Sequence, residues 1–509
     1  MTIAEAVKIN GAPLSLPRAR NMLERARWAA ATFSRYDHRQ TMVIAEAVAS
    51  AAANASEHYG DWAVRETGFG VAEHKALKNR LCSAGVMDDY RGLDLVTPRT
   101  DPDQKFIRVP RPAGVIFALT PSTNPVATLF FNTLLALMTR NSIVISPHPL
   151  ARACCADAAR LLADAAHRAG APDGVIQVVD EPTIPLIEAL MSDELTDVIV
   201  ATGGSSVVRA AYRSGTPAIG VGPGNVPVMV DRTADIERAA ERIVDSKSFD
   251  NSVLCTNESA VIVEEAIKPT LMTAMKRWGA YVLSGDERDR VRDFVFPAGC
   301  FNTATLGQSA EWIASQVGIR VSDRVRVLVA PFDTVIGEEP LAHEKLCPVL
   351  GLVSVPNTRR AIDASRTLVR IGGAGHSAAI HSHDAATIMD FTAAVEVLRV
   401  SVNVGNSTGA SGIDTNLPLS MTLGTGFVGS SSVGRNLEPA DLINWTIVAF
   451  NSDPAEPFAD FDVLQHRWAG QSAQAMGGAT SAQPNTMGLG NREEIRAVIL
   501  EEFKQLMGK

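Results

Sequence analysis

The chain has 509 residues, of which 46% are hydrophobic, and a formal net charge of -9, so it is long enough to build two or three domains around a large core. Its basic residues are scattered rather than clustered, which argues against a surface for nucleic acid or an anionic membrane. No apolar run approaches the ~20 residues that cross a bilayer, and the N-terminus MTIAEAVKING lacks the features of a signal peptide, so we expect a cytoplasmic protein.

From residue 114 onward, short apolar runs alternate with longer helical patterns. This alternation indicates a parallel sheet covered by helices on both faces. In the first series the expected strands are 115–119, 142–145, 175–179, 197–201 and 218–221, and the expected helices end at 138 and 169, span 184–191 and follow Gly204. In the second series the expected strands are 226–230, 260–263 and 325–330, with a helix at 234–248. We therefore predict an α/β fold with a dinucleotide-binding domain followed by a catalytic domain.

The cysteines limit the chemistry. There are six, namely Cys82, Cys154, Cys155, Cys255, Cys300 and Cys347. They are too sparse for a disulfide scaffold and none are paired as C-x-x-C, so we expect free thiols. The sequence has no cluster of His and Cys at ligand spacing, and we expect no metal site. One of the six thiols can then serve as a nucleophile.

Three separated segments carry the residues suited to catalysis: TPSTNP at 120–125, FDNSVLCT at 249–256 and EKLCPV at 344–349. In this order they resemble the aldehyde dehydrogenase superfamily. More narrowly, SPHP at 146–149, GPGN at 222–225, SFDNSVLC at 248–255 and GGAGHSAAIH at 372–381 are similar to the CoA-acylating branch. That branch contains acetaldehyde, succinate-semialdehyde and sulfoacetaldehyde dehydrogenases and the N-terminal half of aldehyde-alcohol dehydrogenases. The resemblance implies a Rossmann-type cofactor domain, a second α/β catalytic domain and a small oligomerisation element.

The resemblance also suggests where the domains begin and end. The expected divisions are a dinucleotide-binding domain at 1–222, in which 96–111 contribute to oligomerisation, a catalytic domain at 223–425 and an oligomerisation or return segment at 426–468. Residues 469–490 carry no charge and are mostly small or polar, which is the composition of a flexible linker.

The last stretch, 491–509, gathers its apolar residues on one face and predicts an amphipathic helix. It resembles the encapsulation peptides that direct enzymes into bacterial microcompartments. A shell protein, bound by this helix in a groove, is therefore an expected partner. The alternative is a tail helix that packs on a neighbouring subunit.

Cys255 and Asn124 match the family's nucleophile and oxyanion donor. Cysteine suits attack on an aldehyde because it is intrinsically nucleophilic and partly ionised near neutral pH. The resulting oxyanion needs donors already in position, which the resemblance assigns to the Asn124 side chain and the backbone N–H of Cys255. Taken alone, Cys255 would be read as a buried structural thiol and Asn124 as a turn residue.

The cofactor-binding residues also follow mainly from the resemblance. Thr202, Gly203 and Gly204 come after an expected strand and before a helix, so backbone N–H groups there can face a pyrophosphate. Glu344 matches the carboxylate that binds the nicotinamide ribose, and the adenosine-ribose contacts fall near Ser146 and His148. The remaining residues assigned to the cofactor are Thr120, Pro121 and Gly222. We expect NAD, with NADP left open.

At one position this sequence lacks a catalytic residue that part of the family carries, and its absence bears on the reaction. Hydrolytic members of the family carry a water-activating glutamate, and aligning their segment on residues 222–225 puts Val221 in its place. Valine cannot act as a base, whereas a thiol with a pKa near ~8.5 is already partly ionised at neutral pH. The sequence therefore favours release of the acyl group to coenzyme A. A hydrolytic dehydrogenase and a catalytically idle assembly component are the alternatives.

His376 resembles a histidine that acylating members keep near the nucleophile. We expect it to orient or deprotonate a thiol, either that of Cys255 or that of CoA; the alternative is a loop histidine bonded to backbone. Acetaldehyde, propionaldehyde, succinate semialdehyde and sulfoacetaldehyde remain open as substrates. Family members are dimers or tetramers, so we expect a homo-oligomer.

Overall fold

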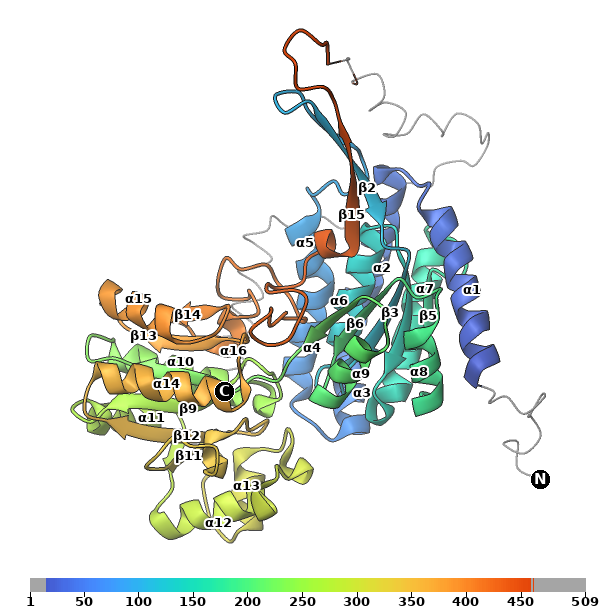
Figure 1. Ribbon diagram of the computed structural model, residues 1–509. Coiled ribbons are helices and arrows are strands. Elements are labelled where there is room, and N and C mark those ends of the chain that lie inside the picture. Colours follow the sequence, from blue (N-terminus) through green and yellow to red (C-terminus); the bar gives the residue numbers. More distant parts are fainter. Residues whose placement is uncertain (1–14, 459–460, 462–509) are drawn as a thin grey trace, which may run out of the picture.

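The computed structural model describes residues 15–458 and residue 461, and its strands form three sheets (Figure 1). The first is parallel and has the order β5-β4-β3-β6-β7. Its strands are β3 (Val115–Thr120), β4 (Ser142–Pro147), β5 (Ile176–Val178), β6 (Val198–Thr202) and β7 (Ala218–Val221). The chain runs outward from β3 through β4 to β5, then returns to place β6 and β7 on the other side. This reversal creates a switch point between β3 and β6, where open α/β sheets bind ligands.

Both faces of this sheet are covered, as a parallel sheet requires. Alternate side chains of β3 point to opposite faces. Val115, Phe117 and Leu119 pack in the core with α1 (Ser15–Phe33), α8 (Ile184–Ser192) and α9 (Ser205–Arg213). Ile116 and Ala118 pack in the other core, with α2 (His38–Asn54), α6 (Pro125–Met138) and α7 (Arg152–Arg168). Helix α6 is buried along its whole length, so it places its first residue firmly at the end of the sheet.

The second sheet is also parallel and has the order β10-β11-β12-β9-β8-β13-β14. Its strands are β8 (Val226–Val230), β9 (Glu258–Glu264), β10 (Ala280–Val282), β11 (Val327–Pro331), β12 (Val349–Val355), β13 (Ala378–His381) and β14 (Val400–Val402). The helices that follow these strands include α10 (Ile236–Ser248), α11 (Lys268–Arg277), α14 (Thr358–Gly372) and α15 (Ala385–Ala394). Only residues 222–225 separate β7 from β8, so a short link joins the two sheets.

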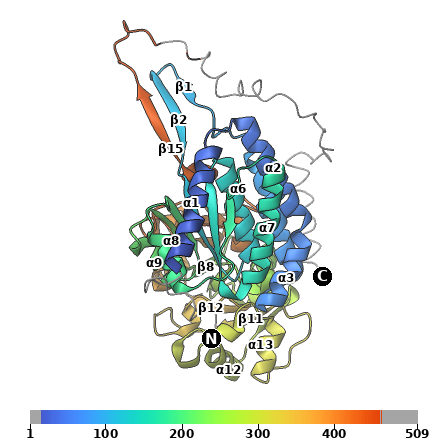
Figure 2. The same cartoon turned by 90° about the vertical axis from the view of Figure 1, so that its right-hand side faces the viewer.

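The third sheet is an antiparallel arm that projects from the body (Figures 1 and 2). It consists of β1 (Arg99–Asp101), β2 (Phe106–Pro112) and β15 (Ile443–Ala449), with β2 in the middle. Pairing of β2 with β15 brings together two segments that the sequence analysis assigned to oligomerisation.

The remaining helices of four or more residues lie before the first sheet, between strands of the second, or between β14 and β15. They are α3 (Ser56–Thr67), α4 (Ala72–Arg80), the π-helix η2 (Leu81–Gly85), α5 (Val86–Tyr90), α12 (Gly285–Val295), α13 (Ala310–Gln316), α16 (Asn406–Gly409) and the short 3-10 turns η4 (Phe249–Ser252) and η8 (Pro439–Leu442). Within the described part of the chain, every helix is too short or too polar to span a membrane.

The predicted α/β class with a parallel sheet in the first domain is confirmed, and the sheet of the second α/β unit is parallel as well. The predicted domain limits stay predictions, and the linker at 469–490 and the amphipathic helix at 491–509 lie outside the described residues.

Candidate active site

The predicted cofactor residues gather at one edge of the first sheet. Thr120 ends β3 and Thr202 ends β6, while Ser146 is the last residue but one of β4 and pairs with Leu119 of β3. Parallel strands end at the same edge, so these residues share the switch-point edge. The Ser146 hydroxyl is buried and has no hydrogen-bond partner in the described structure, which leaves it available for a ligand.

Helix α9 begins at this edge with its first backbone N–H groups open. Gly204 caps the helix and no side chain bonds to its N-terminus. A Cβ at Gly204 would meet no atom within 4 Å, so the space in front of the helix is free. Exposed N–H groups at a helix start suit a pyrophosphate. His148 lies at the next strand end, where its Nδ1 accepts the Leu150 N–H at 3.2 Å. The cofactor edge therefore has groups that fit a dinucleotide.

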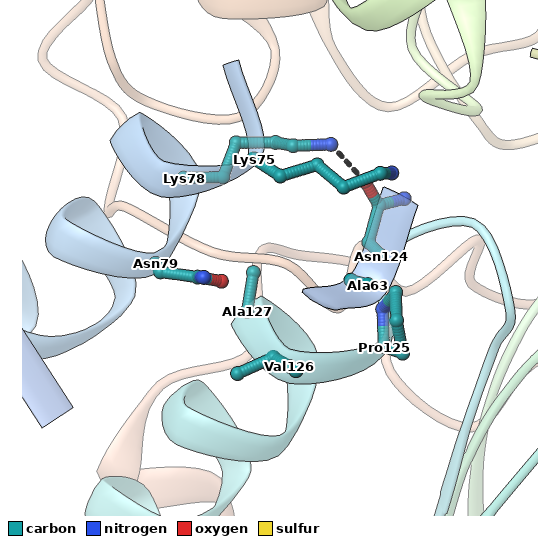
Figure 3. Close-up of a pocket in the computed structure, with 8 residues that line it drawn as sticks. All are labelled: Ala63, Lys75, Lys78, Asn79, Asn124, Pro125, Val126 and Ala127. Atoms are coloured by element: carbon teal, nitrogen blue, oxygen red, sulfur yellow. Dashed lines mark hydrogen bonds between the residues drawn. The ribbon is translucent and has the colours of Figure 1, made fainter. Parts of the chain in front are cut away.

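Asn124 precedes α6 but does not cap it. Its side chain makes no capping bond to the helix. Instead, Oδ1 accepts a hydrogen bond from Nζ of Lys78 on α4 (Figure 3), and Nδ2 lies 3.3 Å from Thr123 Oγ1. A polar side chain at this position would ordinarily serve the helix terminus. Asn124 instead bonds to a buried lysine and leaves the N-terminus of α6 without a side-chain cap.

The loop that carries Cys255 begins with three residues of positive φ. Asp250, Asn251 and Ser252 have φ values of 50°, 50° and 67°, a region that non-glycine residues rarely occupy. The fully buried Asp250 carboxylate accepts bonds from Lys78 and, at 3.1 Å, from Lys75. These lysines hold the pKa of Asp250 below its usual range despite burial. The buried ion pairs therefore support the strained turn before the cysteine.

Residues 222–225 pass directly against Cys255. A Cβ on Gly224 would overlap the carbonyl oxygen of Cys255 and would lie 3.5 Å from Cε1 of His376. The side-chain amide of Asn225 donates to the carbonyl oxygens of Ala342 and Leu368, both at 2.9 Å, which anchors the segment. Val221, at the end of β7, is buried.

Glu344 also contacts Gly224, through its side-chain carboxylate. Its Oε1 accepts the Gly224 N–H at 3.2 Å. The residue keeps part of its surface exposed, yet the carboxylate lies in surroundings poor in water, and this raises its pKa to about 8. Most copies of Glu344 are therefore protonated at neutral pH.

His376 is fully buried and is oriented by a chain of hydrogen bonds. Its Nδ1 lies 3.0 Å from Ser377 Oγ, which accepts the Asn406 side-chain amide at 2.9 Å. The Asn406 backbone N–H in turn donates to Glu258 at 2.7 Å. The other ring nitrogen, Nε2, has no partner among the described residues. Burial, followed by the nearby Arg399 guanidinium, lowers the pKa of His376 to about 3, so the ring is neutral at physiological pH.

Arg399 joins the glycine-rich segment at 372–376 to a second one, GTGFVGSSSVG at 424–434. Its guanidinium donates to the carbonyl oxygens of His376 at 2.9 Å and Gly424 at 2.6 Å, and Nε donates to Asn436 Oδ1 at 2.6 Å. Planar donors in a fixed fork suit such a three-way contact. Arg399 is also the cation that lowers the pKa of Cys255.

The thiol of Cys255 is nevertheless a weak acid in the free protein. Burial raises its pKa to about 12, Glu344 adds to the increase, and Arg399 opposes it. Because the thiolate is the reactive form, its fraction should grow about tenfold per pH unit below the pKa.

This gives a direct prediction for alkylation. The rate at which iodoacetamide modifies Cys255 in the free protein, followed by peptide mass spectrometry, should rise without levelling from pH ~7 to ~10, whereas a free cysteine levels off above its pKa of ~8.5. A plateau near neutral pH would show that the Arg399 guanidinium outweighs burial and Glu344 in setting the pKa of the Cys255 thiol.

The structure thus brings Cys255, Glu344 and His376 together around Gly224, and connects Asn124 to the cysteine loop through Lys78. The residues predicted to bind the cofactor lie at the switch-point edge of the first sheet or just after it: Thr120, Pro121, Ser146, His148 and Thr202–Gly204. Gly222 begins the segment between the two sheets.

The sequence analysis missed Lys78, Asp250 and Arg399. Asp250 belongs to the quoted SFDNSVLC segment and could have been noticed, while no sequence motif around Lys78 or Arg399 marks either cation.

No group of three potential metal ligands occurs in residues 15–458 or at 461, and all six cysteines are free.

Comparison with known proteins identifies the family of this chain. The family model described as "Aldehyde dehydrogenase family" matches residues 14–294. An aldehyde-alcohol dehydrogenase from Clostridium acetobutylicum is 39% identical over 424 residues, which are 82% of this chain and 49% of that protein. The chain therefore spans about half the length of such relatives.

Two solved structures have the same fold. An acetylating aldehyde dehydrogenase from Geobacillus thermoglucosidasius has a TM-score of 0.85 at 37% identity, covering 87% of this chain and 98% of its own. A propionaldehyde dehydrogenase from Rhodopseudomonas palustris, solved with bound CoA and an acylated cysteine, has a TM-score of 0.77 at 28% identity, with coverage of 85% and 97%. This chain belongs to the aldehyde dehydrogenase family and, within it, to the acylating branch.

Proposed function

We propose that the protein is a CoA-acylating aldehyde dehydrogenase that converts a short-chain aldehyde, CoA and NAD(P)+ to an acyl-CoA and NAD(P)H through a thioester on Cys255. The observation that carries this proposal is the passage of residues 222–225 against Cys255. The same segment begins after Val221, which is the position of the water-activating glutamate in hydrolytic members. A buried valine there cannot prepare water for attack.

Glu344 does not replace the missing base. Its carboxylate is close enough to Cys255 to raise the pKa of the thiol, but its own pKa is raised to about 8. A carboxylic acid that is mostly protonated at neutral pH is a poor acceptor for a proton from water. Its bond from Gly224 instead holds it beside the space that a nicotinamide ribose would occupy.

In the proposed reaction the Cys255 thiol gives up its proton to water and the thiolate attacks the aldehyde carbon, so that the aldehyde oxygen becomes an alkoxide. The backbone N–H of Cys255 and the Asn124 amide stabilise this charge as oxyanion donors do. NAD(P)+, when bound, supplies the acceptor for the hydride of the thiohemiacetal. Ser146, His148, the backbone at Thr202–Gly204 and Glu344 would hold that cofactor. The protein's own contribution is to position the thiol and to bind the developing charge.

The thioester is then released to CoA. His376 is neutral at physiological pH and its Nε2 is unpaired, so the ring can accept a hydrogen bond from a thiol. The chain through Ser377 and Asn406 fixes its orientation. A neutral imidazole held this way orients the CoA thiol. The CoA sulfur attacks the acyl carbon, the bond from that carbon to Sγ of Cys255 breaks, and the CoA proton passes to the departing sulfur to restore the Cys255 thiol. The bound CoA and acylated cysteine of the Rhodopseudomonas palustris relative support this order of events.

The proposed partners follow the family pattern. A homodimer or homotetramer would use the arm of β1, β2 and β15, which projects from the body. Residues 491–509 are proposed to bind a microcompartment shell protein, and the enzyme would then act inside such a compartment.

The decisive test measures NAD(P)H formation with and without CoA. Acetaldehyde, propionaldehyde, succinate semialdehyde and sulfoacetaldehyde are each supplied with either nucleotide, and products are identified by mass spectrometry. We expect CoA to raise the rate about tenfold or more and acyl-CoA to be the product. Equal rates without CoA, with free acid as product, would establish the hydrolytic reaction. Lack of turnover on every aldehyde would favour an idle assembly component.

A further inference from the structure

Two buried lysines on α4 point toward the oxyanion donor and the nucleophile loop (Figure 3). Lys75 and Lys78 are 3% and 2% exposed, and Asp250 is fully buried. Lysine is almost never buried to this extent unless it is paired. Here two ammonium groups share one carboxylate, so the site holds one more positive charge than Asp250 balances. Such a costly arrangement calls for a function beyond packing.

The bonds of the two lysines differ in a way that separates their roles. Lys75 donates to Asp250 and to the Thr123 carbonyl oxygen at 2.9 Å. Lys78 donates to Asp250 and to the side-chain oxygen of Asn124. Lys78 therefore contacts both the proposed oxyanion donor and the carboxylate that supports the turn before Cys255. It connects the first residue of α6 with a loop that follows α10.

An ammonium group can only donate hydrogen bonds, and its partner must present an acceptor. Burial lowers the pKa of Lys78 to about 8, with Asp250 opposing the shift, so most copies carry the charge at pH 7. The Asn124 oxygen must then face Lys78, and the amide N–H groups must face away from it. An asparagine without this partner could rotate its amide and present oxygen to the alkoxide, where it would repel rather than bind the charge.

The space around the lysines excludes the alternative that Lys78 binds the tail of a substrate. The adjoining cavity has a volume of about 10 Å³ and is lined by Lys75, Lys78, Asn79 and Asn124 together with the apolar residues Ala63, Pro125, Val126 and Ala127. This volume is comparable with a single water molecule, so an anionic substrate tail does not fit there.

We propose that Lys78 is a positioning residue that fixes the Asn124 amide so that the N–H not donated to Thr123 Oγ1 faces the reacting aldehyde oxygen, and that it ties this donor to the nucleophile loop through Asp250. The inference rests on the proposed function only in that Asn124 binds the oxyanion. That step precedes release of the acyl group and is common to acylating and hydrolytic chemistry.

The test is a double-mutant comparison of Lys78→Met, Asn124→Ala and the two combined, with Lys75→Met as the matched control. Methionine preserves the length of the side chain, and in each lysine variant Asp250 keeps the other lysine as a partner. Removing one oxyanion donor typically lowers kcat by ~10²–10³-fold, so Asn124→Ala should show a loss of this order. Lys78→Met should lower kcat about tenfold or more while changing the aldehyde KM by less than about threefold.

The combined variant measures how much Lys78→Met lowers kcat when the Asn124 side chain is already absent, and this value decides the proposal. If Lys78 acts through Asn124, Lys78→Met should have an effect of no more than about twofold in the Asn124→Ala background. Lys75→Met should lower kcat less than Lys78→Met does, because Lys75 bonds to Asp250 and Thr123 but not to the Asn124 side chain. A full and independent loss in that background would overturn the proposal, as would an equal loss in Lys75→Met. Wild-type NAD(P)H formation in the same assay tests the proposed function separately.

Should Lys78→Met fail to fold, Lys78→Arg and Lys78→Gln replace it. Arginine only donates, as lysine does, whereas glutamine can also accept and so tolerates a rotated Asn124 amide. We expect the arginine variant to keep at least about ten times the kcat of the glutamine variant. Equal activity of these two variants would overturn the proposal.

Discussion

Replacement of Cys255 with serine is expected to reduce CoA-dependent NAD(P)H formation at least ~10³-fold, which corresponds to about 4 kcal/mol in the barrier. The hydroxyl of serine is a far weaker acid than a thiol, and no strong base lies beside it, because Glu344 is mostly protonated and the pKa of His376 is lowered to about 3. An ester, if formed, would also transfer its acyl group to CoA less readily than a thioester.

The measurement compares kcat/KM of Cys255→Ser with that of Cys300→Ser, which alters an exposed thiol and should behave like the wild type. Mass spectrometry of protein incubated with an acyl-CoA should show an added acyl group on the wild type and on Cys300→Ser, but none on Cys255→Ser. Undiminished turnover by Cys255→Ser would remove the thioester from the mechanism.

The sequence predicted the sheets well because parallel strands buried on both faces are continuous apolar runs. The expected strands at 218–221 and 226–230 coincide with β7 and β8. The cofactor edge follows from the same pattern, since every strand of a parallel sheet ends on one side. The resemblance then supplied Cys255, Asn124 and His376 as candidates, and their chemical roles stay predictions.

Lys78 and Arg399 could not be predicted in this way. Lys78 bonds to residues 46 and 172 positions away, and the pattern of α4 gives no reason to bury it. Arg399 precedes a short edge strand and reaches backbone oxygens of His376 and Gly424, which no side-chain motif records. Both contacts arise only when the glycine-rich segments and the two sheets are packed together. The limits of the domains and the role of residues 491–509 remain predictions for a different reason, because no contact described here bears on them.

The structure gives a physical reason for the second glycine of the GPGN segment at 222–225, a residue to which the sequence alone assigns no role of its own. The backbone of Gly224 has an ordinary conformation, since it is absent from the residues with positive φ. Its lack of a side chain is needed because a Cβ would overlap the Cys255 carbonyl oxygen and lie 3.0 Å from the carbonyl carbon. The backbone of the nucleophile is thus in direct contact with the link between the two sheets.

Gly224→Ala is therefore expected to lower kcat by about 10²-fold or more, because even a ~1 Å displacement of a reacting group has effects of this size. Overpacking should also destabilise the protein by about 1–3 kcal/mol. The control is Gly372→Ala, whose new Cβ would meet only the Cβ of Asn225 at 3.9 Å, and which should keep its activity and thermal midpoint.

Both variants are assayed below their melting temperatures, so that lost activity reflects the folded enzyme. Alkylation of Cys255 by iodoacetamide reports on the nucleophile independently of turnover, and its rate should change in Gly224→Ala but not in Gly372→Ala. If Gly224→Ala instead keeps wild-type kcat and alkylation rate, then the 222–225 segment can move without shifting Cys255. The contact would in that case not position the thiol, and the argument from Val221 to acyl transfer would lose the geometry on which it depends.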